Sequence, residues 1–217
     1  MEAKTYEIIS INVGKPKKFI YNGKEFVTGI QKQPVDGPVF LSFLNFSGDG
    51  QADLVHHGGR DKAVCVYPYD HYAYWEHELE RKLDVAAFGE NLTVKGLLET
   101  EVCIGDTFQL GEAVVQVSQP RQPCHKIAKK HRVNDLPLRV QHTGYTGFYF
   151  RVLKEGWVET QSSLQLIEKH PLNITVSFAN QIMFHDKTNK EGIEQILRVD
   201  ELSESFRDSL MKRLQSI

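Results

Sequence analysis

A cysteine flanked by prolines and basic side chains is the residue of this chain best suited to chemistry. Cys124 closes the stretch Gln-Pro-Arg-Gln-Pro-Cys at residues 119–124. We expect the preceding strand to stop at the prolines and Pro123 to begin a short basic helix, with the cysteine in its first turn. The positive end of that helix, Arg121 and Lys126 would favour the thiolate, which is both a nucleophile and a soft metal ligand. A free cysteine is more often a small buried hydrophobe, so both roles stay open.

A second stretch, His-Gly-Gly-Arg-Asp-Lys at residues 57–62, combines paired glycines with basic side chains. The glycines allow backbone to come close to a ligand, and side chains such as His57 and Lys62 could hold an anion. The spacing is not that of a phosphate-binding P-loop, and a surface turn with solvated charges is the simpler interpretation. Cys65 lies within an apolar strand and Cys103 alternates into an apolar face, so we expect both to be structural.

Three further polar residues lie where they could meet a ligand. Glu90 and Asn91 stand at the mouth of an expected strand, where they could hydrogen-bond a heterocycle or close a turn. Arg151 lies inside an apolar strand, where an arginine either extends to solvent or meets an anion. The pattern alone does not choose between these roles.

Composition narrows the class of protein. The chain has 217 residues, 41% of them hydrophobic and 25% charged, which is typical of an ordered globular fold. A net charge of -2 predicts no bulk attraction to nucleic acid or to an anionic membrane. The three cysteines show no CxxC spacing, which argues against a disulfide framework or a zinc knuckle. No apolar signal core or membrane-length apolar run is visible, so we expect a reducing, cytoplasmic setting.

Short apolar runs separated by turn residues dominate the first three quarters of the chain. We expect strands at residues 5–13, 39–46, 63–67, 92–94, 113–118 and 148–153, and a hairpin at residues 19–27 around Asn22-Gly23. A helix is expected at residues 70–82, and irregular structure at residues 134–139. Many short strands with few helices between them favour a mainly β, barrel-like architecture over a parallel α/β sheet.

The pattern changes near Pro171. Three helical runs follow, at residues 176–184, 190–198 and 204–214, with Thr175, Asn189 and Ser203 as expected N-caps. Helices this short must pack on something to be stable. We therefore divide the chain into a strand-rich domain at residues 1–165 and a small three-helix domain at residues 166–217.

Several stretches, in this order along the chain, resemble a MOSC domain of the YiiM type. They are Asp-Gly-Gln-Ala-Asp (49–53), His-Gly-Gly-Arg-Asp-Lys-Ala-Val (57–64), Tyr-Pro (67–68), Phe-Gly-Glu-Asn-Leu (88–92), Gln-Val-Ser-Gln-Pro-Arg-Gln-Pro-Cys (116–124) and Thr-Gly-Phe-Tyr-Phe-Arg-Val-Leu (146–153). The terminal helices resemble the 3-alpha domain that follows MOSC in this subfamily, so the resemblance covers nearly the whole chain. It implies a MOSC β-barrel, of the kind also found in the pyruvate kinase barrel domain, with a C-terminal three-helix domain.

The resemblance also implies chemistry. The cofactor would be molybdenum bound through a pyranopterin dithiolene, with Cys124 as the protein's thiolate ligand to molybdenum. The activity would be reduction of N-hydroxylated compounds, such as N-hydroxylaminopurine, to amines, which links the family to detoxification of base analogues. Cationic candidates for the pterin phosphate are Arg121, Lys126, Arg151 and Lys62. Candidates to contact pterin or substrate are His57, Glu90 and Asn91, and His57 or His125 would donate the proton that accompanies loss of oxygen.

Expected partners follow from the same resemblance. The substrate would be a small molecule, and no nucleic acid or membrane partner is expected. Electrons would come from a separate flavin or iron–sulfur reductase, because the sequence shows no motif for either group; a homodimer is left open. Two other functions remain: a sulfur carrier or transferase with a persulfide on Cys124, and a module that binds the molybdenum cofactor without catalysis.

Overall fold

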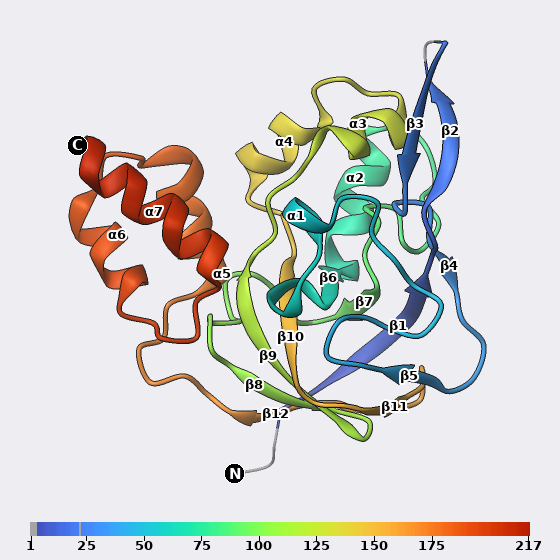
Figure 1. Cartoon of the computed structure of the whole chain (residues 1–217), viewed down its shortest axis with the longest axis horizontal. Coiled ribbons are helices and arrows are strands. Elements are labelled where there is room, and N and C mark those ends of the chain that lie inside the picture. The colour runs from blue at the N-terminus through green and yellow to red at the C-terminus, as the bar shows by residue number, and fades with distance from the viewer. Residues whose placement is uncertain (1–3, 22) are drawn as a thin grey trace.

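A closed seven-stranded barrel forms the larger part of the protein in this computed structural model (Figure 1). The structure describes residues 4–21 and 23–217, without the side chains of residues 24, 55 and 56. The strands pair in the order β12-β8-β9-β10-β6-β7-β1, and pairing of β1 with β12 closes the ring. Their bounds are β1 Thr5–Val13, β6 Val64–Pro68, β7 Leu92–Lys95, β8 Thr107–Leu110, β9 Ala113–Pro120, β10 Phe148–Lys154 and β12 Leu164–Glu168. The expected mainly β, barrel-like fold is confirmed.

Inward side chains of the strands fill the barrel, as β9 illustrates. Along β9, Ala113, Val115 and Val117 are buried, while Val114 and Gln116 between them are half-buried. Neighbouring strands pair antiparallel except β6 and β7, which run parallel. The inward side chains form one apolar core, and removal of this surface from water is the main force that holds the barrel together.

Smaller strands extend the barrel. The expected hairpin is confirmed as β2 Lys17–Tyr21 and β3 Lys24–Thr28, although Asn22 of its turn lies outside the described residues. β4 Gln33–Pro34 pairs with β1, and β5 Val39–Leu41 pairs with β11 Gly156–Val158. The strand expected at residues 39–46 was too long, because the Ser42 hydroxyl accepts from the amides of Leu44 and Asn45, both at 3.3 Å, and turns the chain.

Helices cover one end of the barrel (Figure 1). They are α1 Leu54–His57, α2 Tyr72–Glu78, α3 His125–His131 and α4 Leu136–Thr143, with 3₁₀ turns at Arg60–Lys62 and Tyr69–His71. The helix expected at residues 70–82 is shorter, because Glu80 adopts a left-handed φ of 51°. Irregular structure at residues 134–139 was wrong: Pro137 falls in the first turn of α4, where its missing amide hydrogen has no helical partner to lose.

The C-terminal segment folds into α5 Val176–Asn180, which continues as a π-helical turn at Gln181–His185, then α6 Lys190–Leu197 and α7 Glu204–Ser216. All three expected N-caps are confirmed. Thr175 accepts from the Phe178 amide at 3.0 Å, Asn189 from Gly192 at 2.8 Å and Ser203 from Phe206 at 3.3 Å.

These helices pack around an apolar cluster of their own, which includes Ile182, Ile193, Ile196, Phe206 and Leu210. They lie beside β9 at one side of the barrel (Figure 1). The division of the chain at residue 165 stays a prediction. Within the described part of the chain, no helix combines the length and apolar character that crossing a membrane requires.

Candidate functional site

Cys124 stands at the start of α3, where the chain leaves the barrel. β9 ends at Pro120, two residues beyond the expected 113–118, because Pro120 still pairs opposite Phe148 and the next amide, that of Arg121, donates to the Gly147 carbonyl at 3.0 Å. The helix begins at His125, so Cys124 is the N-cap and not a first-turn residue. Its backbone is extended, with φ −111° and ψ 164°, and its side chain is half-buried and makes no capping hydrogen bond. The Cys124 thiol is therefore not used to cap the helix.

Two clefts meet at this cysteine. The inner cleft reaches into the end of the barrel beside Arg121 and Asn91. The outer cleft opens beside His125 toward the C-terminal helices. Both clefts are lined by the same five residues: His57, Lys62, Cys124, Lys126 and Tyr149.

Arg121 is the most constrained cation of the inner cleft. Only 6% of the residue is exposed, and its Nη2 donates to the Phe88 carbonyl. Its Nη1 is buried and has no hydrogen-bond partner within the described residues. A buried donor without a partner is costly, and a guanidinium stays charged at any physiological pH. This atom therefore points to a ligand with negatively charged oxygen atoms.

His57 and the lysines around it make the clefts electropositive. Burial, followed by the charges of Lys126 and Arg121, lowers the pKa of His57 to about 4. Burial also lowers the pKa of Lys62, against the opposing effect of Asp61. His57 is thus neutral at pH 7. The cations Arg121, Lys62 and Lys126 lie around the cysteine. They outnumber the one carboxylate among the described residues that line the clefts, Asp53, an arrangement that favours binding of an anion.

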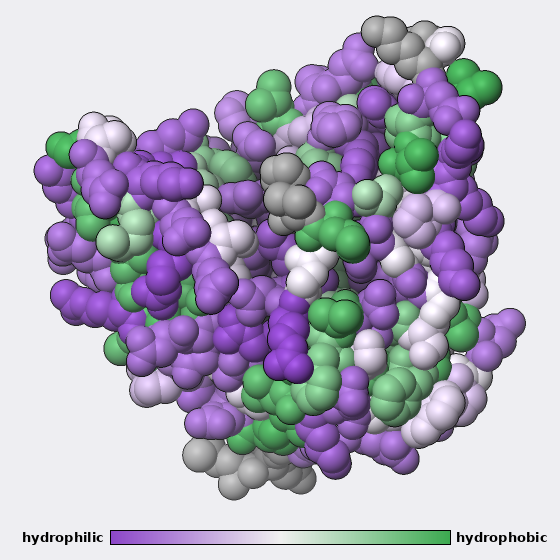
Figure 2. Space-filling view, in the orientation of Figure 1, coloured by the Kyte–Doolittle hydropathy of each residue, from purple (hydrophilic) through white to green (hydrophobic). Residues whose placement is uncertain are grey.

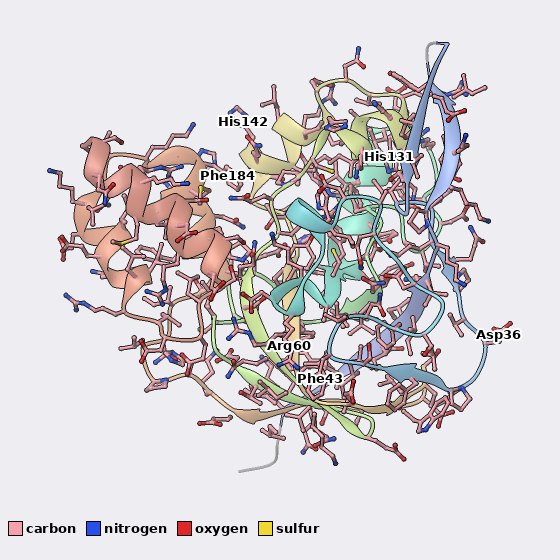
Figure 3. The ribbon with its side chains drawn as sticks, in the orientation of Figure 1. Asp36, Phe43, Arg60, His131, His142 and Phe184 are labelled. Atoms are coloured by element: carbon pink, nitrogen blue, oxygen red, sulfur yellow. The ribbon has the colours of Figure 1, made fainter. Side chains whose placement is uncertain are left out.

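Arg60, from the same loop, takes no part in either cleft. Its guanidinium lies over the Phe43 ring, 4.6 Å from the centroid, on the barrel surface (Figure 3). Of the basic residues in the glycine-rich loop, His57 and Lys62 are the ones that line the clefts.

Asn91 belongs to a buried polar wall of the inner cleft. Its Nδ2 donates to Asp49 at 2.9 Å, its Oδ1 accepts from the Cys65 amide at 3.1 Å, and Asp49 in turn forms a buried ion pair with Lys32. Lys32 also lines the cleft. Sequence reasoning missed this pair, although Asp49 opens the first of the motifs quoted above.

Cys65 and Tyr149 form another part of the inner cleft. The neighbours Val64 and Val66 join the barrel core. Cys65 between them is buried, as expected, and it also borders the inner cleft. Burial raises the pKa of the Cys65 thiol to about 11 and raises the pKa of the Tyr149 phenol, so both are protonated at neutral pH. Tyr149 was missed because it sits between Phe148 and Phe150 in what looks like an apolar strand.

Two predicted residues do not reach either cleft. The Glu90 carboxylate is fully buried and accepts from the Tyr72 hydroxyl, from the Phe88 amide at 3.0 Å and from the Thr93 hydroxyl at 3.1 Å. Arg151 meets an anion, but this anion is the Asp61 carboxylate, which lies 2.7 Å away. Both residues support the walls from outside the clefts.

His125 lines only the outer cleft, where it is exposed. Partial burial, followed by the charges of Lys129 and Lys126, lowers its pKa. Among the described residues, no three His, Cys, Asp or Glu side chains gather as a metal site. The soft sulfur ligand that Cys124 offers and the unpartnered Arg121 Nη1 fit a metal-bearing group that brings its other ligands and an anionic tail.

Comparison with known proteins agrees with the fold. The MOSC domain family matches residues 53–165, and the YiiM-like, 3-alpha helix domain family matches residues 174–216. Protein YiiM of Escherichia coli is 37% identical over 189 residues, which cover 86% of this chain and 84% of that protein. The uncharacterized protein YflK of Bacillus subtilis is 57% identical over 213 residues, 98% of this chain and 96% of its own. The crystal structure of YiiM from Geobacillus stearothermophilus, 42% identical, superposes with a TM-score of 0.83 over 96% of this chain and 99% of that one.

Proposed function

The chain belongs to the MOSC-domain family of the YiiM type, and from that premise we propose that it is a molybdenum-cofactor-dependent reductase that converts N-hydroxylated compounds to amines. A protein of Gibberella moniliformis named "Reductase", 38% identical over 166 residues, supports a redox role. The chain matches 75% of its own length to 29% of that protein, so the match concerns one part of a longer chain.

One observation carries the proposal: a half-buried thiol and an unpartnered buried guanidinium open into the same cleft. Cys124 would supply the protein's thiolate ligand to molybdenum, since sulfur suits a soft, redox-active metal. Arg121, Lys62 and Lys126 would hold the phosphate of the pterin, with the arginine able to bind two oxygen atoms at once. Asn91 and Lys32 would line the ring system of the pterin. Asp49, which contacts both side chains, would hold them in place.

The chain's own residues then set orientation and proton supply. When bound, the cofactor would supply two-electron chemistry for removal of oxygen from the N–OH group, and the protein would supply position and electrostatics. An anion in the inner cleft would oppose the charges of Lys126 and Arg121 and so raise the pKa of His57 from about 4 toward its ordinary range. His57 would then carry a proton beside Cys124, and His125 could exchange protons between the outer cleft and solvent.

The remaining roles concern partners and place. A separate flavin or iron–sulfur reductase would deliver the electrons, the substrate would be a small molecule, and the reaction would run in the cytoplasm. We leave a homodimer open. Tyr149 borders both clefts, and its phenol is protonated. It would donate a hydrogen bond to a ligand bound where the two clefts meet.

The test is the molybdenum content and N-hydroxy reduction of the wild type and Cys124→Ser, made in cells that synthesise the pterin. Cys103→Ser is the matched control, because this thiol is buried and lines neither cleft. We expect metal and turnover in the wild type and in Cys103→Ser, and loss of both in Cys124→Ser. Equal activity of Cys124→Ser and the wild type would refute the proposal.

Other outcomes would favour the alternatives. A persulfide on Cys124 without molybdenum would indicate a sulfur carrier. Bound cofactor without turnover, despite a competent reductant, would indicate a binding module. Cys65→Ser should mainly cost stability, because its thiol is buried and remains protonated.

A further inference from the structure

The outer cleft has walls from two different parts of the chain. Cys124, His125 and Lys126 form the barrel side, and Ser205 and Ser209 of α7 form the opposite side. The two serines are four residues apart on one helix, so their side chains stand on the same face, one turn apart. Both serines are exposed, and the three-helix segment thus contributes directly to the surroundings of the cysteine.

Hydrogen bonds fix α7 to the segment that carries the cysteine. Gln119, five residues before Cys124, accepts through Oε1 from the Ser203 hydroxyl at 2.7 Å and from the Ser205 hydroxyl at 3.3 Å. The Ser203 amide donates to the Ser118 carbonyl at 3.0 Å. These residues are buried except Ser205, so the contacts hold the first turn of α7 at a set position relative to the cleft.

Asp61 adds a second tether, this time to the glycine-rich loop. Its Oδ2 accepts from the Glu204 amide at 3.3 Å, and its Oδ1 pairs with Arg151. The loop that carries His57 and Lys62 is therefore joined to the same helix end that presents Ser205. Both sides of the outer cleft are positioned by one set of contacts.

The two walls differ in hydrogen-bonding character. The barrel side carries charged groups, the cations Lys62 and Lys126 and the Asp53 carboxylate. On the α7 side, the Ser209 hydroxyl donates its proton to the Ser205 carbonyl at 2.9 Å, and the Ser205 hydroxyl donates to Gln119. Each hydroxyl has only one proton, so both oxygens are left as acceptors toward the cleft. Figure 2 shows that the face over α6 and α7 is mostly hydrophilic.

From this arrangement we propose that Ser205 and Ser209 are substrate-binding residues: they accept hydrogen bonds from N–H groups at the end of the substrate, and the three-helix segment thereby selects polar, N–H-bearing compounds. This inference rests on the proposed function for the identity of the site but is tested by binding alone. It gives α7 a role in recognition, with Gln119 as the residue that positions it.

The experiment measures equilibrium binding of adenine and of purine to the full-length protein by calorimetry. The two probes share one ring system, and only adenine carries the amino group. The variants are Ser205→Ala with Ser209→Ala, and the control is Ser216→Ala. Ser216 also lies on α7 and also donates to a backbone carbonyl, that of Arg213 at 2.7 Å, but it lines neither cleft. Thermal unfolding checks that every variant is folded, as expected for exposed serines.

We expect the wild type and the control to bind adenine about five- to tenfold more tightly than purine, and the double variant to bind both equally. Equal affinities in the wild type, an unchanged preference in the double variant, or binding of neither probe would overturn the inference. In the loaded enzyme, the double variant should raise KM for an N-hydroxylamino heterocycle without a change in kcat. Turnover by the double variant with unchanged KM and unchanged probe binding would leave the reductase proposal intact and refute the role of the two serines. Discrimination between the probes without turnover would support the role of the serines and refute the reductase proposal.

Discussion

Replacement of Arg121 by methionine should make the cofactor-free protein more stable while it removes the ability to hold an anion. The substitution keeps an unbranched stem of similar length and deletes a guanidinium whose Nη1 is buried without a partner. Residues placed for a ligand often reduce the stability of the empty protein, because their unsatisfied groups are buried in advance of binding. Arg121→Met therefore allows the stability cost of the buried guanidinium and its role in anion binding to be measured separately.

The magnitude follows from two opposing effects. A charge buried without a full partner carries an effective penalty of several kcal/mol, which the variant relieves. The variant also leaves the Phe88 carbonyl without its Arg121 donor, which costs about 1–3 kcal/mol. We expect a net gain of about 1–2 kcal/mol, which is roughly 2–8 °C in Tm for a chain of this length.

The assay is thermal unfolding of Arg121→Met, Arg121→Lys and the wild type, all made in cells that cannot synthesise the pterin. Arg121→Lys keeps the charge and should show no gain. Phosphate should raise the Tm of the wild type and not that of Arg121→Met, and molybdenum content from pterin-competent cells should fall in the same variant. A less stable Arg121→Met that keeps its molybdenum would show that the guanidinium is a structural group.

Three further predictions concern groups around the clefts. Lys32→Met and Asp49→Asn each leave one member of a buried ion pair alone, so each should cost about 3–5 kcal/mol in urea unfolding, and the double variant should cost less than their sum; small additive losses would contradict a buried pair. Asp61→Asn weakens the half-buried pair with Arg151 and the contact with α7, so we expect a loss of about 1 kcal/mol and faster amide exchange in the first turn of α7; unchanged exchange would remove the tether from the account. Burial lowers the pKa of His131 from 6.5 to about 4, so the stability that this neutral histidine provides is full above pH 6.5 and is lost as the pH falls toward 4, by up to about 1.4 kcal/mol per pH unit. His131→Gln should flatten unfolding free energy over that pH range, and an equally steep dependence would assign the effect to another group.

Local signals in the sequence were enough for most of the barrel and for the helix starts. The alternation in β1, the apolar run of β10 and the caps at Thr175, Asn189 and Ser203 are short-range features, and each is found where the sequence places it. Most errors came from local conformations that the residue pattern did not reveal, such as the turn at Ser42, the left-handed Glu80 and the helix start at Pro137. At Pro120 the cause is a partner distant in sequence: it remains in β9 because it pairs opposite Phe148, and the next amide donates to the Gly147 carbonyl just before β10.

The candidate site was predictable by residue type but not by contact. Cys124, Arg121, His57, Lys62, Lys126 and Asn91 do line the inner cleft, as basic and soft-ligand chemistry suggested. Glu90 and Arg151 are equally polar in sequence, yet their partners come from other strands and loops and draw them away from the clefts. Tyr149 was missed for the opposite reason, since an aromatic residue between two phenylalanines gives no polar signal.

The stretch from Gln119 to Cys124 explains why a cysteine at this place can serve a site that two parts of the chain share. All strands of a closed barrel pair with neighbours on both sides, which leaves no free edge. The cysteine of this chain lies just after the point where β9 leaves the rim of the barrel. Pro120 allows that exit, after which Arg121 turns inward to the Phe88 carbonyl and Cys124 ends at the meeting point of both clefts. Gln119, at the other end of the stretch, holds α7 through Ser203. Six consecutive residues thus set the distance between anion-binding group, sulfur and opposite wall, so an inserted residue here should abolish function even where the barrel still folds.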